Sequence, residues 1–201
     1  AGAQVVSLSG ITSGAANENQ ALTVTASSGN LGLIPTPTVT YTSPNSTGSL
    51  NFTPAANSNG VATITVTVSD GVAQLSRTFT VTVNAVNDAP TLNTIGNLSL
   101  SESAGAQVVS LSGITSGAAN ETQTLTVTAS SGNTGLIPTP TVTYTSPNAT
   151  GSLSFAPAAN SNGVATITVT VSDGVAQFSR AFTVTVNAVN DAPTLNTIGN
   201  L

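Results

Sequence analysis

Several residue types are absent from this sequence, and each absence excludes a kind of chemistry. The 201 residues contain no cysteine, histidine, lysine, methionine or tryptophan, and arginine occurs only twice. Without histidine or cysteine the chain cannot form an ordinary zinc, copper or haem site, or the Ser/His and Cys/His pairs of nucleophilic enzymes. The lack of lysine excludes a Schiff base and a phosphate-binding P-loop. We therefore expect no enzymatic function.

Charge and long apolar runs are also scarce. Charged residues make up 4% of the chain, and the formal net charge is -5. Binding to nucleic-acid phosphates needs many lysine and arginine side chains, so no nucleic-acid partner is expected. No apolar run approaches the roughly 18 residues that a membrane-spanning helix needs, so no membrane insertion is expected in this segment. The chain is nevertheless 39% hydrophobic and rich in β-branched residues, which indicates a folded protein.

An internal repeat governs the organisation of the chain. Residues 1–98 align without a gap on residues 104–201, and only 8 of the 98 aligned positions differ. A period near 100 residues corresponds to one small domain per repeat. We expect a first β-sandwich repeat over 1–89 that lacks its first strand in this window, a complete second repeat over 90–191, and the first strand of a third repeat over 192–201. The sequence is thus interpreted as a part of a longer array.

The complete repeat shows strict alternation of apolar and polar residues and no helical period. In the segment 164–171, for example, Ala165, Ile167, Val169 and Val171 alternate with threonines and other residues of the opposite face. Seven strands are predicted, over residues 92–100, 107–114, 123–130, 140–146, 151–157, 164–172 and 177–187. Seven short strands in about 100 residues are typical of an Ig-like sandwich. The predicted fold is all-β, with tandem Ig-like or cadherin-like seven-stranded β-sandwiches joined head to tail.

All seven acidic residues fall in predicted loops. They occupy four places in the repeat: Glu18 and Glu121, Asp70 and Asp173, Asp88 and Asp191, and Glu102. Since strand direction alternates, the loops of Glu121 and Asp173 lie at one end of the predicted sandwich, and those of Glu102 and Asp191 lie at the other. In a head-to-tail array these two ends would meet at each joint between domains.

Like charges gathered at a joint destabilise it unless a cation neutralises them. Calcium prefers about six to eight oxygen ligands, which carboxylates, amide oxygens and water can supply. The predicted ligands are Asn87, Asp88, Glu121 and Asp173 at the joint inside this chain, Glu102, Asn190 and Asp191 at the next, and Glu18 and Asp70 as the counterparts in the first repeat. The alternative is that these acids simply occupy exposed loops, because Asp173-Gly174 is an ordinary turn and no strict DxDxDG-type loop is present.

One combination of motifs resembles a known family. Val-Ser-Asp-Gly, a strand of threonine and valine, and then Val-Asn-Asp-Ala-Pro resemble the cadherin-like tandem repeats of large bacterial surface proteins, including long adhesins. The resemblance implies calcium at the joints, held by Asn190-Asp191, Glu102, Asn120-Glu121 and Asp173. The linker here has one acid where that family has two, and Asn160 and Asn162 replace acids of another loop. Fewer ligands imply one weakly bound calcium ion per joint, or none.

Two functions follow from these expectations, both at the cell surface or in a secreted protein. The first is a calcium-stiffened stalk or spacer in cell adhesion, whose partners are the neighbouring repeats of the same chain. The second is a subunit of an extracellular filament or sheath, in which other copies pack side by side or exchange strands. The second is favoured by walls that carry almost no charge, and by a window that starts without a first strand and ends with one.

Overall fold

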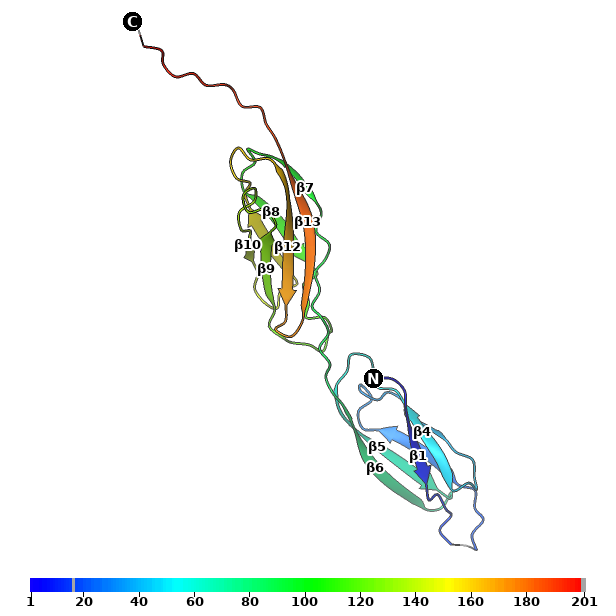
Figure 1. Ribbon diagram of the computed structural model, residues 1–201. Coiled ribbons are helices and arrows are strands. Elements are labelled where there is room, and N and C mark those ends of the chain that lie inside the picture. The colour runs from blue at the N-terminus through cyan, green and yellow to red at the C-terminus, as the bar shows by residue number, and fades with distance from the viewer. Residues whose placement is uncertain (16, 200–201) are drawn as a thin grey trace. The chain divides into compact units, whose positions relative to one another are not determined.

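The computed structural model describes residues 1–15 and 17–199, which contain strands and no α-helix. The chain divides into two compact units, Ala1–Val86 and Asn87–Leu201, and each is described by itself (Figure 1). Among the described residues, no helix is long and apolar enough to cross a membrane. The all-β class expected from the alternation is confirmed.

Unit 2 is a two-layered sandwich. Its strands are β7 (Leu98–Ser101), β8 (Gln107–Ser112), β9 (Thr126–Ser131), β10 (Thr141–Thr143), β11 (Thr150–Phe155), β12 (Gly163–Ser172) and β13 (Gln177–Asn187). One sheet has the order β10-β11-β8 and the other the order β7-β13-β12-β9. All neighbours are antiparallel except β7, which pairs in parallel with β13. This arrangement is that of an Ig-like sandwich.

The segment before β7 differs from the single strand predicted over 92–100. Its first part follows the edge of β8, where the Thr91 amide donates to the Thr115 carbonyl at 3.0 Å and the Asn93 amide donates to the Ser112 carbonyl at 2.9 Å. The chain then crosses to the other sheet, where β7 begins at Leu98. The segment is split between two sheets because Leu92 and Ile95, in its middle, are buried in the core between them.

Alternation along β12 and β13 builds the core of unit 2. Ala165, Ile167, Val169 and Val171 are almost completely buried, and Phe182 is 3% exposed opposite them. The threonines between them face outward, as period two requires. Side chains of the other sheet, such as Leu111 and Leu153, complete the same cluster. A core of this kind supplies most of the stability of a small sandwich.

Unit 1 repeats most of this sandwich. Its strands are β1 (Gln4–Ser9), β2 (Thr23–Ser28), β3 (Thr38–Thr40), β4 (Thr47–Phe52), β5 (Gly60–Ser69) and β6 (Gln74–Val83). They form two sheets of order β1-β4-β3 and β2-β5-β6. Its fully closed core is smaller and consists of Leu33, Ile34, Leu50, Phe52, Ala62 and Ile64.

The two units differ where unit 2 holds the segment before β7. In unit 1 a groove of about 680 Å³ lies between the sheets, lined among others by Val6, Leu8, Val68 and Phe79. The counterparts of these residues in unit 2 are covered by the segment of Leu92. Unit 1 therefore exposes part of an inner surface that unit 2 buries.

Residues 188–199 form no strand. Leu195 and Ile198 in this segment are 84% and 77% exposed. Asn200 and Leu201 lie outside the described residues, so the strand expected over 192–201 stays a prediction.

Candidate functional site

The acidic turn after β12 is the centre of the candidate site in unit 2. The Oδ1 atom of Asp173 accepts hydrogen bonds from the amides of Val175 and Ala176 at 2.7 and 2.6 Å. The loop needs this acceptor because the chain reverses within a few residues, leaving amides that no strand partner can satisfy. Asp70 makes the same two bonds after β5, to the amides of Val72 and Ala73.

Asp173 has a further partner, which Asp70 lacks among the described residues. Its Oδ2 atom accepts a hydrogen bond of 3.0 Å from the side-chain amide of Asn87. The Oδ1 atom of Asn87 in turn accepts a hydrogen bond of 2.8 Å from the Nε2 atom of Gln123. This chain of bonds joins the linker, the segment before β9 and the β12–β13 turn. Asp173 is correspondingly only 6% exposed.

Glu121 holds the linker at a second point. Its Oε1 atom accepts a hydrogen bond of 2.7 Å from the Asp88 backbone amide, and its Oε2 atom accepts one of 3.3 Å from the Ala118 amide. In unit 1 the corresponding Glu18 accepts from the Ala15 amide at 3.2 Å. The structure thus brings Asn87, Glu121 and Asp173 together through hydrogen bonds, with the backbone of Asp88 among them.

Hydrogen bonding also alters the acidity of the turn aspartates. Donation from the Ala176 amide and then from the Asn87 side chain holds the pKa of Asp173 below its usual value, although burial of the carboxyl opposes this. The pKa of Asp70 is likewise lowered, first by the Ala73 amide and then by the Val72 amide. Both groups are therefore carboxylates at neutral pH and act as acceptors.

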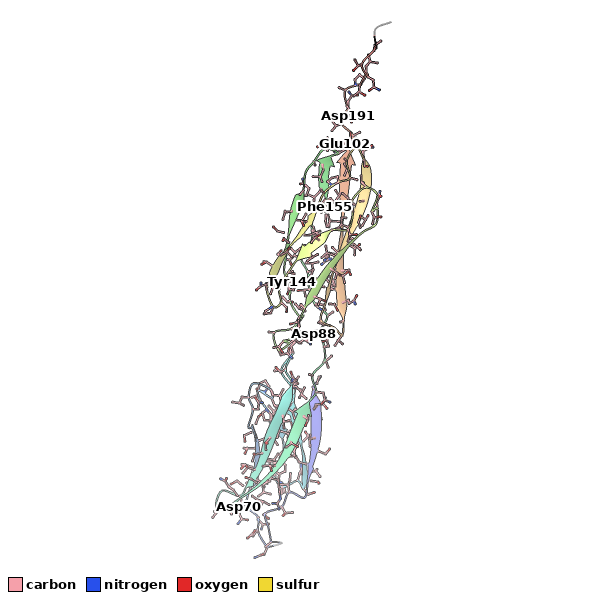
Figure 2. All side chains as sticks on the ribbon, turned by 90° about the vertical axis from the view of Figure 1, so that its left-hand side faces the viewer. Asp70, Asp88, Glu102, Tyr144, Phe155 and Asp191 are labelled. Carbon is pink, nitrogen blue, oxygen red and sulfur yellow. The ribbon has the colours of Figure 1, made fainter. Side chains whose placement is uncertain are left out.

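The remaining predicted residues lie at the opposite end of unit 2, where Glu102 and Asp191 are labelled in Figure 2. Glu102 is 8% exposed, and its Oε1 atom accepts a hydrogen bond of 2.7 Å from the Val189 amide. The side chain of Asn190 donates to the Asp191 carbonyl at 3.3 Å, as Asn87 does to Asp88 at 3.2 Å. Asn190 and Asp191 are exposed. The acids of unit 2 thus lie at two opposite ends.

The fit of these residues to a calcium ion rests on the oxygen atoms that are still available. In the described part of the chain, no group of three or more acidic side chains is close enough to hold a metal ion. The carboxylates of Glu121 and Asp173 already accept hydrogen bonds. The Asp88 side chain is exposed, and the buried Oε1 atom of Gln123 has no hydrogen-bond partner among the described residues. Calcium at this end stays a prediction.

Two residues of the site were not predicted from the sequence. Gln123 lies in the segment assigned to a strand, and its bond to Asn87 had no sequence signal because the two are 36 positions apart. The Nε atom of Arg180 donates to the Leu92 carbonyl at 3.2 Å, and its guanidinium lies 4.8 Å from the centre of the Phe178 ring. The only indication in the sequence was that Arg180 lies two positions before Phe182 on β13, on the side of the strand that alternation turns inward.

The comparison with known families agrees with this architecture. Residues 3–84, which comprise the strands of unit 1, match the family described as bacterial Ig domain. Unit 1 therefore corresponds to a bacterial Ig-like domain over almost its whole length. Because unit 2 repeats the sequence of unit 1 with few differences, the Ig-like description extends to it. The bacterial Ig-like domain is a structural domain and not an enzyme family, so the predicted non-enzymatic character agrees with the match.

Several solved structures are similar to the chain at low sequence identity and low TM-score. A structure of surface layer protein SbsC, domains 1–6, is 21% identical, with a TM-score of 0.37, and the alignment covers 84% of this chain and 20% of that one. The titin domains z1z2 in complex with telethonin are 12% identical, with a TM-score of 0.42 and coverages of 85% and 83%. An endo-fucoidan hydrolase of glycoside hydrolase family 107 is 22% identical, with a TM-score of 0.35 and coverages of 84% and 24%.

The chain spans about a quarter of that hydrolase and a fifth of the SbsC structure. At these scores none of the three likenesses bears on function. A search of curated proteins gives no significant match.

Proposed function

We propose that this bacterial Ig-like chain is a spacer segment of an extracellular surface protein, one that carries other parts of the protein away from the cell. The observation that carries the proposal is that two nearly identical repeats each enclose a hydrophobic cluster of their own. Domains that fold separately extend a chain in proportion to their number. The strands carry threonine outward, and the acids occupy the ends of the sandwich, as suits a wall without a binding site.

A more specific version of this proposal is an adhesive stalk that calcium stiffens. In it, a calcium ion binds near Asp88 and Gln123 and stiffens the connection between repeats. The exposed Asp88 carboxylate and the unpartnered Gln123 oxygen support the idea, since calcium accepts carboxylate and amide oxygens together with water. The hydrogen bonds of Asn87 and of the Asp88 amide already fix the linker on unit 2. Calcium would add rigidity to a segment that is held without it.

The filament or sheath is the second candidate function. Walls almost free of charge favour it, because few like charges then oppose the close packing of neighbouring chains.

Length measured against copy number tests the spacer. One further copy of residues 99–201 is added to the chain, and the maximum dimension of both chains is measured by small-angle scattering at low concentration. A strand of 11 residues spans about 36 Å, so each repeat should add about 40 Å to the maximum dimension.

A maximum dimension that stays almost unchanged when the repeat is added would mean that the longer chain is compact, and it would contradict the spacer. Ordered fibres of many chains in negative-stain images would favour the filament instead.

A further inference from the structure

One short segment of each repeat combines prolines with threonines, and we call it the threonine segment. Its sequence is Pro-Thr-Pro-Thr-Val-Thr-Tyr-Thr-Ser-Pro, over residues 35–44 in unit 1 and 138–147 in unit 2. These two segments hold six of the ten prolines of the chain. In unit 2 the segment contains β10, the three-residue strand at the edge of the sheet β10-β11-β8.

One side of the threonine segment is anchored in the core of unit 2. Ile137, directly before the segment, is 0% exposed, and Pro140 is buried. Val142 and Tyr144, the latter labelled in Figure 2, pack against the hydrophobic cluster of the unit. A side-chain carbon on Gly151 would lie only 3.2 Å from the Tyr144 ring, so the glycine lets the ring pack closely on β11. The segment is therefore held in place from its inner side.

The other side of the threonine segment faces solvent. Alternate residues of an extended chain point to opposite sides, so the positions between the anchored residues point outward. These positions hold four threonines in each repeat. All eight are exposed: Thr139, Thr141, Thr143 and Thr145 in unit 2, and Thr36, Thr38, Thr40 and Thr42 in unit 1. Each repeat thus presents a row of four hydroxyl groups along one edge of a sheet.

Thr36 and Thr139 differ from the rest of the row because each lies between two prolines. Proline fixes its own φ and restricts the preceding residue to extended conformations, so both threonines are held extended. Neither residue belongs to a strand. Among residues 1–15 and 17–199, no hydrogen bond engages either hydroxyl group. An enzyme could enclose this extended stretch without breaking the pairing of a strand.

Exposed threonines on other edge strands lack this combination. Thr25 on β2 and Thr128 on β9 are exposed, but the strands that contain them pair with β5 and β12. No proline flanks either residue. An enzyme that binds an extended acceptor would have to detach these threonines from their sheets.

We propose that Thr36 and Thr139 are acceptors for O-linked glycosylation. Segments rich in threonine and serine that also contain proline are typical of O-glycosylated stalks. The donor is a sugar activated by a diphosphate leaving group. The threonine Oγ1 atom attacks the anomeric carbon and forms a new O–C bond. The diphosphate leaves with the electron pair of the broken C–O bond, and the threonine proton passes to a base of the transferring enzyme.

A sugar at these positions would protect an edge that has no other guard. Edge strands are commonly protected against pairing with other chains by lysine or other charges, and the threonine segment contains none. A bulky, hydrated sugar on Thr139, two residues before β10, would hinder such pairing. The inference goes beyond the spacer function, because the threonines can be modified whether or not the repeats lengthen a surface protein.

Mass spectrometry of the protein isolated from the organism that makes it is the first test. Cleavage after leucine releases the peptides 34–50 and 137–153, which differ at Ser46 and Ala149 and so report on the two repeats separately. We expect each peptide to exceed its sequence mass by a whole number of monosaccharide residues. Electron-transfer fragmentation should place the sugar on Thr36 and Thr139, and mild alkali should remove it by elimination.

Two results of this experiment would overturn the proposal. The first is that both peptides have their sequence masses only. The second is that the sugar is confined to other residues, for example an alkali-resistant sugar on Asn148, which begins an Asn-Ala-Thr sequence of the N-glycosylation type.

The double variant Thr36→Val/Thr139→Val, produced in the same organism, is the second test. Valine keeps the branched side chain and removes the hydroxyl group, and both sites are exposed, so the fold should be kept. Calorimetry checks that the unfolding transitions are unchanged. We expect the added mass of both peptides to disappear.

Thr25→Val/Thr128→Val is the matched control, because it removes two exposed hydroxyl groups that lie within strands. This variant should keep the full added mass on both peptides. An equal loss of sugar from the two double variants would show that the position of the threonine is irrelevant, and the proposal would fail.

The unmodified recombinant chain distinguishes the possible donors. It is incubated with extracts of the producing organism and with uridine diphosphate sugars. Transfer by the membrane-free extract would identify a nucleotide sugar as the donor, and transfer that needs the membrane fraction would identify a lipid-linked one. If neither fraction modifies Thr36 or Thr139, the proposal is wrong. The length added per repeat is measured on this same unmodified chain, so the spacer and the glycosylation are tested separately.

Discussion

At the scale of the residue, the same aspartate has different surroundings in the two repeats. Asp70 and Asp173 both accept two amides of the turn that follows them. Asp173 alone receives the side chain of Asn87, and it is the more buried of the two. A difference between two copies of one turn therefore comes from the linker that passes over it.

The acid sensitivity of unit 2 should depend on Asp173. Its pKa is lowered in the folded state by the Ala176 amide and by Asn87, against about 3.9 in an unfolded chain. The stabilisation is then complete above about pH 5 and is lost as the pH falls through the lowered pKa. We expect Asp173→Asn to reduce the free energy of unfolding at pH 7 and to flatten its decrease between pH 5 and pH 2.

Chemical denaturation followed at several pH values measures this effect. Asp70→Asn is the control, and it should have the smaller effect because no side chain donates to Asp70 in the described residues. Equal acid sensitivity in the parent chain and in Asp173→Asn would show that this carboxylate does not stabilise the fold.

Which acids gather at one end could be predicted from strand alternation alone. Glu121 and Asp173 were placed together because their loops follow strands that run in the same direction. Their hydrogen-bond partners could not be predicted, since the bond from Gln123 to Asn87 depends on the path of the linker across the sandwich. Side-chain geometry of this kind has no period in a sequence.

At the scale of the element, β5 and β12 have an identical sequence and different burial. Ile64 and Ile167 are both 0% exposed, but Val68 is half-buried where Val171 is 0% exposed. Alternation correctly predicted which side of each strand faces inward. How deeply each residue is buried depends on the segment before β7, which the sequence places many residues away.

Truncation of the two strands should reveal this difference. Removing two buried methyl groups in Val171→Ala should cost about 2 kcal/mol of stability, because the site is closed on all sides. Val68→Ala should cost less than about 1 kcal/mol, since part of that side chain already faces water. The unfolding transition of each unit, followed by calorimetry, measures both changes.

The pair Ile64→Ala and Ile167→Ala is the internal control. Both isoleucines are fully buried, so both variants should lose about 2–5 kcal/mol. A similar loss for Val68→Ala and Val171→Ala would mean that the groove of unit 1 is filled in solution.

At the scale of the whole molecule, the sequence indicated two repeated domains, and the chain divides into two compact units. The Ig-like fold could be predicted because alternation, turn residues and repeat length all agree. A calcium site could not be settled in the same way, because carboxylates serve equally well as acceptors for loop amides, and here Glu121 and Asp173 do so.

Removal of calcium tests the proposed stiffening. Calcium at a free concentration of one hundred times its dissociation constant would add about 2.7 kcal/mol to the free energy of unfolding. Chelation should therefore lower the unfolding midpoint or loosen the chain in scattering. Asp88→Asn removes an exposed carboxylate and leaves the hydrogen bond from the backbone amide of residue 88 to Glu121 in place. It should leave the chelated chain unchanged and reduce the response to calcium.

If neither the midpoint nor the scattering profile responds to chelation, calcium has no part in this protein. The repeats would then rely on hydrogen bonds alone to hold Asn87 and Asp88.

The parallel pairing of β7 with β13 has a mechanical consequence. Tension on the chain pulls β7 toward the end of unit 2 where the chain enters, and it pulls β13 toward the end where the chain leaves. The two strands are loaded in opposite directions along their length, so the bonds between Leu98–Ser101 and Val184–Asn187 resist in shear and must break together. Unit 2 thus carries a force clamp between its first and last strands.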